Sequence, residues 1–299
     1  MASVAPVATH PAPSAVAELL KPITWFPPMW AFACGVVASG QTLEGRWPLV
    51  VAGVLLAGPF VCATSQAVND WFDRDVDAIN EPHRPIPSGR MPGRWGLYVA
   101  LIGTLLSLLL STTLGPWGFG AAVVGLVLAW AYSAPPVRLK RNGWWGNAAC
   151  GLSYEGLAWI TGAAVMAGEQ MPSVPSMVLA LLYSAGAHGI MTLNDFKAIE
   201  GDRKMGIASL PVQLGPTGAA WAACATMVLA QLAVIGCLLA WGQPVHAVAI
   251  AGCMAVQLLM MKRFVAKPVA RAVWFSGLGV PLYVAGMMIS AFALRGGVQ

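Results

Sequence analysis

The sequence predicts an all-α integral membrane protein with nine transmembrane helices. Of its 299 residues, 58% are hydrophobic and only 10% are charged, and the mean hydropathy is +0.68. Soluble domains carry about 25% charged residues, so much of this surface must contact lipid. The same composition excludes a disordered chain. Thirteen Trp residues fit this class, because Trp is enriched where a membrane protein meets the headgroups.

Nine apolar stretches approach the length of about 20 residues that a helix needs to cross the hydrocarbon core. The third is the plainest, because its segment LYVALIGTLLSLLLSTTL contains no charge. The first is the weakest, because Pro27 and Pro28 interrupt it, although membrane helices tolerate proline better than soluble ones. The predicted spans are 23–40, 47–68, 95–114, 117–133, 147–167, 174–193, 217–241, 245–261 and 272–294.

The N-terminal segment differs from these spans. Residues 1–20 are rich in Ala, Pro and Val, and they lack the basic start of a signal peptide and the Arg residues of a transit peptide. We predict a disordered tail over residues 1–20 and one transmembrane domain over residues 21–299. The absence of targeting features favours a multi-pass protein of a bacterial inner membrane, cytoplasmic or intracytoplasmic.

Basic residues indicate the orientation. Nine spans place the two termini on opposite sides. With the N-terminus in the cytoplasm, every Lys and Arg except Arg46 and Arg295, 15 of the 17, is cytoplasmic. This asymmetry follows the positive-inside rule. It supports the helix count as well, since one missed helix would invert part of the distribution.

The acidic residues are clustered. Two cytoplasmic segments, after the second and sixth spans, hold eight of the 12: Asp70, Asp73, Asp75, Asp77, Glu81, Asp195, Glu200 and Asp202. Solvated loops would explain charge at these places, but not its spacing. Asn69, Asp73 and Asp77 are four residues apart and share one face of a helix. Asp195 and Asp202, seven apart, share a face if their helix continues.

Oxygen ligands of this kind suit a hard cation, Mg²⁺ before Zn²⁺. Mg²⁺ is usually held by one or two carboxylates together with substrate phosphates. Two acidic clusters on one membrane side therefore predict a pair of Mg²⁺ sites that clamp a diphosphate. Arg84, Lys140, Arg141 and Lys197 would add positive charge there.

The chain resembles the UbiA family of membrane prenyltransferases, and within it the branch of chlorophyll and bacteriochlorophyll synthases. The resemblance covers nearly the whole chain from Lys21 onward. It depends on long motifs: NDWFDRDVD (69–77), DAINEPHRPIPSGR (77–90), YSAPPVRLKRNGWWGN (132–147) and NDFKAIEGDR (194–203).

The resemblance implies a UbiA-type helical bundle that esterifies bacteriochlorophyllide a with geranylgeranyl or phytyl diphosphate and releases diphosphate. It implies Mg²⁺ as cofactor, with Asn69, Asp73, Asp77, Asp195 and Asp202 as metal-binding catalytic residues. Tyr132 and Ser133 match a pair that contacts the diphosphate in the family, and Lys140 matches a basic residue downstream. Ala198 stands where many members have Asp, which leaves the second metal with fewer carboxylates and fits the chlorophyll branch.

Two ionisable residues, Glu155 and His188, lie well inside predicted spans, where a charge costs at least about 2.5–3.5 kcal/mol. His188 precedes Asp195 by seven residues, so we expect it on the same face and about 10 Å deeper. We predict that both residues bind the pigment: His188 as a ligand of its Mg or a donor to a ring carbonyl, Glu155 by orienting a polar group. Alternatively, the two satisfy each other or a backbone carbonyl.

Other functions stay open at this point. A UbiA-type enzyme could act on chlorophyllide a, a quinone ring or haem, although a quinone enzyme should show the Asp that Ala198 replaces. A membrane transporter should show internal repeats, and none is clear. A pigment-binding scaffold would not need two carboxylate clusters. We expect substrates and membrane lipid as partners and no nucleic acid, and the oligomeric state stays open.

Overall fold

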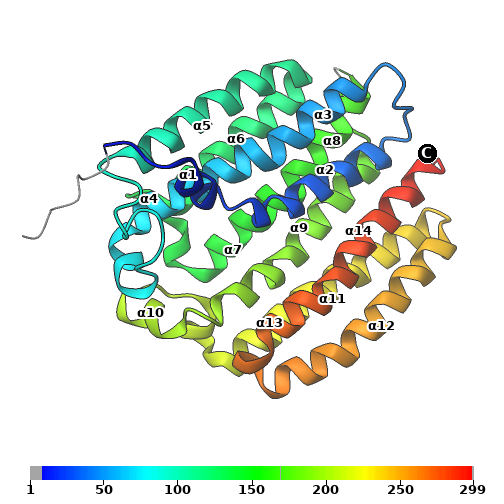
Figure 1. The fold of residues 1–299 in the computed structure, drawn as a ribbon. Coiled ribbons are helices and arrows are strands. Elements are labelled where there is room, and N and C mark those ends of the chain that lie inside the picture. Colours follow the sequence, from blue (N-terminus) through cyan, green and yellow to red (C-terminus); the bar gives the residue numbers. More distant parts are fainter. Residues whose placement is uncertain (1–8, 169, 298–299) are drawn as a thin grey trace, which may run out of the picture.

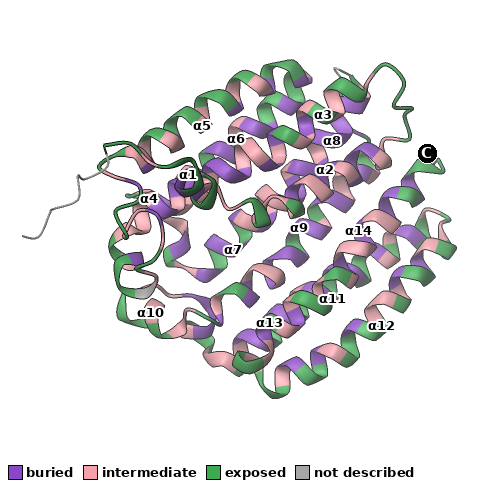
Figure 2. Ribbon diagram, viewed as in Figure 1, coloured by how far each residue is buried: buried purple, intermediate pink, exposed green. Residues whose placement is uncertain are grey.

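The computed structural model describes residues 9–168 and 170–297, and its regular elements over these residues are helices. The helices run alongside one another in a bundle (Figure 1). The all-α prediction is thus confirmed. Figure 2 shows many exposed residues along α5 (Trp95–Ser111) and α12 (Pro244–Ala266). Large apolar residues such as Leu105 and Leu259 are among the exposed residues of these helices. An apolar exterior of this kind suits lipid rather than water.

Among the described residues of the first half, five long helical rods form the bundle, where a rod is one helix or two helices joined end to end. One is α2 (Phe26–Ala38), and the next joins α3 (Trp47–Leu55) to α4 (Ala63–Asn80) through a π-helical turn, Leu56–Cys62. Two more are α5 (Trp95–Ser111) and α6 (Gly115–Ser133), which lie side by side in Figure 1. The fifth joins α7 (Gly143–Gly151) to α8 (Ala158–Ala167) through a second π-helical turn, Leu152–Leu157.

The second half adds α9 (Val174–Asp195), the short α10 (Ile199–Lys204), α11 (Leu210–Ala240), α12 (Pro244–Ala266), α13 (Pro268–Leu278) and α14 (Val280–Arg295). Six stretches of the described residues are long and apolar enough to span a membrane: Trp47–Ile79, Trp95–Ser133, Val174–Asp195, Leu210–Ala240, Pro244–Ala266 and Pro268–Arg295. The predicted number of nine spans and the cytoplasmic N-terminus stay predictions.

The disordered tail predicted for residues 1–20 is wrong for its second half. Residues 13–20 form helix α1 (Pro13–Leu20), whose Ala15 and Leu19 are buried. These two residues are one helical turn apart, so they form an apolar face, which packs on α4. Glu18 of α1 also accepts two hydrogen bonds from Arg90, at 2.6 and 2.9 Å. Residues 1–8 lie outside the described residues.

Helices α2 and α8 approach each other closely because glycines line their contact. A Cβ atom at Gly35 would lie 2.0 Å from the carbonyl oxygen of Trp159, and one at Gly162 would lie 2.1 Å from that of Phe32. Small residues allow helix backbones to meet in this way within a membrane. This contact holds together two of the rods that surround the central cavity.

Candidate functional site

The bundle encloses a cavity of about 1420 Å³. Pockets for one drug-sized ligand measure about 300–1,000 Å³, so this space is large enough for more than one such molecule. One end is lined by acidic and basic side chains, among them Asp73, Asp202 and Lys140. The other end is lined by small residues, including Ala122 of α6 and Gly53 of α3. A charged headgroup and an apolar tail therefore both find matching surroundings.

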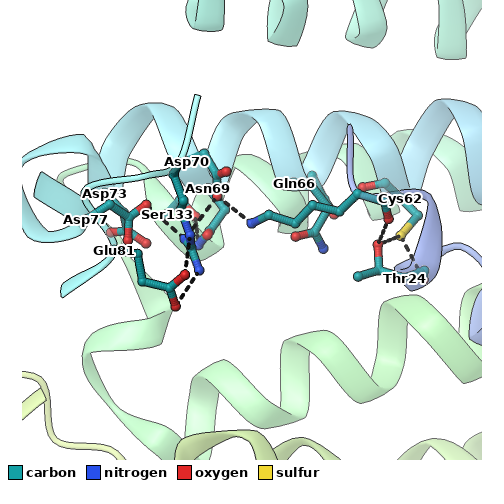
Figure 3. Close-up of polar contacts among 12 residues, drawn as sticks. Thr24, Cys62, Gln66, Asn69, Asp70, Asp73, Asp77, Glu81 and Ser133 are labelled. Carbon is teal, nitrogen blue, oxygen red and sulfur yellow. Dashed lines mark hydrogen bonds and ion pairs between the residues drawn. The ribbon is translucent and has the colours of Figure 1, made fainter. Parts of the chain in front are cut away.

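Helix α4 carries the first acidic cluster. Asn69, Asp73 and Asp77 all line the cavity, as expected from their shared helix face. Asp73 contacts Lys140 and accepts a hydrogen bond from Arg138 at 3.2 Å. Figure 3 shows Asn69, Asp73 and Asp77 along one side of the helix. The helix continues to Asn80, past residue 68 where the predicted span ends, and so carries the acidic cluster on one helix as expected.

Arg84 connects the first cluster to the loop that follows it. Its guanidinium lies 2.9 Å from Asp77, 3.1 Å from Glu81 and 3.5 Å from Asp70. Asp70 is 2% exposed, and it also accepts a hydrogen bond from Lys21 at 2.6 Å. Sequence reasoning missed the roles of Asp70 and Lys21, since the partners come from segments far apart in the chain.

The second acidic cluster is built differently from the prediction. Helix α9 ends at Asp195, and Asp202 belongs to the separate short helix α10, so the condition for a shared helix face, one continuous helix, is not met. Both residues nevertheless line the cavity. Asn147 of α7 donates a hydrogen bond to Asp195 at 3.3 Å. Burial raises the pKa of the Asp202 carboxyl. The break between the helices turns α10 back toward the cavity.

The oxygen ligands of both clusters fit a hard cation. Carboxylates from α4, α9 and α10 and the Asn69 amide line one end of the cavity, and Mg²⁺ prefers such oxygens. Over the described part of the chain, no three Asp, Glu, His or Cys side chains already converge on a point that would hold a metal. The carboxylates of Asp73 and Asp77 are instead neutralised by Lys140, Arg138 and Arg84.

Among the predicted diphosphate-binding residues, Arg84, Tyr132, Lys140 and Lys197 line the cavity. The Lys140 ammonium group lies 6.0 Å from the centre of the Tyr132 ring. Burial lowers the pKa of Lys140, although Asp73 opposes that shift. Ser133 lies just behind this surface and accepts a hydrogen bond from Asn69 at 3.3 Å.

Arg141 does not join these residues. It is exposed and is not part of the cavity lining. Leu139–Arg141 form a 3₁₀ turn, in which successive side chains point about 120° apart. Since Lys140 points inward, Arg141 points outward. Its predicted contact with the diphosphate stays a prediction, and the structure places its side chain outside the cavity lining.

The expectation that His188 faces the same space as Asp195 is wrong. His188 lines a separate cavity of about 450 Å³, where its ring stacks on Trp144 with 5.5 Å between centres. Its Nε2 lies 3.2 Å from the Trp144 carbonyl oxygen. Helix α7 packs on α9 at this point and covers the side chain. Glu155 is buried, 4% exposed, and it too lies outside the lining of the large cavity.

The lining residues that were not predicted include three polar ones that lie together: Cys62, Gln66 and Tyr154. Gln66 donates a hydrogen bond to the Tyr154 hydroxyl at 3.0 Å, and the Cys62 thiol lies 3.5 Å from the same oxygen. Cys62 and Gln66 lie four or three residues apart in series with Asn69, so helix periodicity could have placed them on the polar face of α4. The position of Tyr154 depends on a π-helical turn, which helix periodicity in the sequence does not reveal.

Comparison with known proteins identifies the fold and the family. The model of the UbiA prenyltransferase family matches residues 25–292. The "Bacteriochlorophyll synthase 33 kDa chain" of Cereibacter sphaeroides is 57% identical over 286 residues, which cover 96% of this chain and 94% of the relative. A chloroplastic chlorophyll synthase of Oryza sativa is 40% identical over 289 residues, which cover 92% of this chain and 75% of the relative.

A solved structure of a UbiA homologue from Archaeoglobus fulgidus, bound to GPP and Mg²⁺, has the same fold. Its TM-score is 0.64 at 18% identity, and the match covers 95% of this chain and all of that one. At this identity the likeness shows the fold alone. The family match and the close relatives show more: this chain is a membrane prenyltransferase that belongs to the UbiA family.

Proposed function

We propose that this enzyme esterifies bacteriochlorophyllide a with geranylgeranyl or phytyl diphosphate and releases diphosphate. One observation carries the proposal. A cavity with a charged end and an apolar end lies in a chain that is 57% identical to a bacteriochlorophyll synthase. The two ends match a diphosphate headgroup and a prenyl chain, and the size of the cavity leaves room for a second, bulky substrate.

The charged end would hold Mg²⁺ through Asn69, Asp73, Asp77, Asp195 and Asp202, all of which line it. The Archaeoglobus fulgidus homologue binds GPP and Mg²⁺, which supports the same pairing here. When bound, Mg²⁺ neutralises charge on a leaving diphosphate. Lys140 and Arg84 would then exchange their contacts with Asp73 and Asp77 for contacts with diphosphate oxygens.

The bond changes are simple. The allylic C–O bond breaks, and its electron pair leaves with the diphosphate. A carboxylate oxygen of the pigment then forms the new bond to the same carbon. Because a carboxyl group with a pKa of about 4 is ionised at neutral pH, the acceptor needs no general base. The enclosing helices keep water away from the allylic cation.

Nine membrane crossings with a cytoplasmic N-terminus complete the proposal. The rods α2, α3–α4, α5, α6, α7–α8, α9, α11, α12 and α13–α14 would each cross once in a bacterial inner membrane. The acidic clusters would then face the cytoplasm. Single cysteines placed at Ser88 and at Gln41, in a background without the six native cysteines, should be labelled from opposite sides of the membrane.

Chlorophyllide a is the second candidate acceptor, because the Oryza sativa relative is a chlorophyll synthase. Purified protein should receive each acid in turn, with geranylgeranyl diphosphate and Mg²⁺, and the pigment ester should be separated by chromatography. We expect bacteriochlorophyllide a to give the higher kcat/KM. A higher value for chlorophyllide a would favour the second candidate, and no ester from either acid would refute both.

A further inference from the structure

Two π-helical turns contribute to the wall of the cavity, Leu56–Cys62 on the α3–α4 rod and Leu152–Leu157 between α7 and α8. Such turns are rare and occur frequently at functional sites. The second turn places Tyr154 in hydrogen-bonding distance of Gln66, which lies one helical turn after the first. The Gln66–Tyr154 bond therefore joins two rods that are far apart in the sequence.

The position of this pair follows from helix geometry. Figure 3 shows Gln66 between Cys62 and Asn69 on α4. Gln66 precedes Asn69 by three residues and Asp73 by seven, which places it about 4.5 and 10 Å further along the axis. The pair lies where the charged end of the cavity gives way to the apolar part. A nucleophile that attacks the allylic carbon from the side opposite the diphosphate would lie at this depth.

Gln66 and Tyr154 can both offer hydrogen-bond donors to a ligand in the cavity. A tyrosine hydroxyl has one O–H to give, and a glutamine amide has two N–H groups. The Tyr154 oxygen accepts from Gln66, and the Cys62 thiol lies 3.5 Å from the same oxygen. Sulfur is a weak hydrogen-bond partner, so an entering carboxylate can replace Cys62 at the Tyr154 hydroxyl, where it accepts the Tyr154 O–H and the second N–H of Gln66. Two neutral donors thus lie side by side on the cavity wall.

Three of the cations that line the cavity already have carboxylate partners. Lys21 contacts Asp70, Arg84 contacts Asp70 and Asp77, and Lys140 contacts Asp73. A carboxylate that enters from the apolar part of the cavity would therefore meet the neutral donors of Gln66 and Tyr154 first. Neutral donors stabilise the ionised carboxylate and leave its charge available for attack on the allylic carbon.

From this arrangement we infer that Gln66 and Tyr154 form the binding site for the carboxylate of the acceptor substrate. The inference depends on the proposed function, because it assumes an acid as acceptor. According to this inference, Gln66 and Tyr154 make the enzyme bind a free carboxylic acid more tightly than the corresponding ester or amide. A hydrogen bond to a charged group changes affinity by about 10- to 100-fold, so each residue should contribute a preference of that size.

The test compares binding of bacteriochlorophyllide a with binding of its methyl ester, followed by pigment absorbance in the absence of prenyl diphosphate. The wild-type enzyme should bind the acid at least about tenfold more tightly than the ester. Tyr154→Phe should reduce this preference about tenfold or more, without changing the affinity for the ester or the KM for prenyl diphosphate. Tyr98→Phe, at an exposed position on α5, is the matched control.

Gln66→Glu provides a second variant of nearly the same shape. Its carboxylate can still accept a hydrogen bond from Tyr154, so the rods stay joined, but it repels an acid. We expect the ester to bind at least as tightly as the acid in this variant. An unchanged acid-to-ester ratio in both variants, an equal loss of affinity for acid and ester, or no preference in the wild type would overturn the inference. Failure of the wild type to esterify any acid would instead refute the proposed function.

Discussion

Replacing Lys140 with Met should slow the reaction by removing one positive charge from the diphosphate end of the cavity. The Lys140 side chain is 7% exposed and contacts Asp73. Two unit charges 4 Å apart interact by about 4 kcal/mol at an effective dielectric constant near 20. Removing one group that stabilises developing charge typically costs 10²–10³-fold in kcat. We therefore expect kcat/KM for prenyl diphosphate to fall by about 10²–10³-fold.

Folding should be less affected than catalysis. A buried charge left without a partner costs about 3–5 kcal/mol, but Asp73 keeps Arg138 at 3.2 Å. The loss of stability should therefore lie below that range. Thermal unfolding in detergent measures it, and product chromatography at varied prenyl diphosphate concentration measures kcat and KM.

Arg141→Met is the matched control, since it removes the same charge from the adjacent residue. Arg141 is exposed and lies outside the cavity lining, so its removal should change kcat/KM by less than about threefold. Equal effects of the two substitutions would refute the assignment. So would a Lys140→Met enzyme that changes only the KM for the pigment.

Three other perturbations test the cavity and its frame. Asp77→Asn should raise the Mg²⁺ concentration for half-maximal activity about tenfold or more, and EDTA should abolish activity until Mg²⁺ is restored; an unchanged Mg²⁺ titration would contradict metal binding at this residue. Ala122→Phe should fill the apolar end of the cavity and shift the kcat/KM preference toward prenyl diphosphates shorter than geranylgeranyl, whereas Val124→Phe, on the exposed side of α6, should not. Gly162→Ala should lower stability by about 1–3 kcal/mol, because its methyl group would meet the Phe32 carbonyl oxygen at 2.1 Å. Gly120→Ala, which has open space around it on α6, should not lower the melting temperature.

The sequence by itself determined the features that depend on local pattern. Composition indicated the apolar helical class, and four-residue spacing placed Asn69, Asp73 and Asp77 on one face of α4. Both follow from helix periodicity, which needs no knowledge of neighbouring segments. The long motifs indicated the family in the same way, because they can be compared position by position.

Only the tertiary structure decided which side chains meet. The 3₁₀ turn at residues 139–141 directs Lys140 inward and Arg141 outward, although both are basic and adjacent. The end of α9 at Asp195 brings Asp202 to the cavity on a separate helix, and α7 separates His188 from it. The hydrogen bond between Gln66 and Tyr154 depends on a π-helical turn and on the packing of two rods, because the two residues are 88 positions apart in the sequence. Helix ends, irregular turns and contacts between distant segments arise from packing, and no local pattern in the chain encodes them.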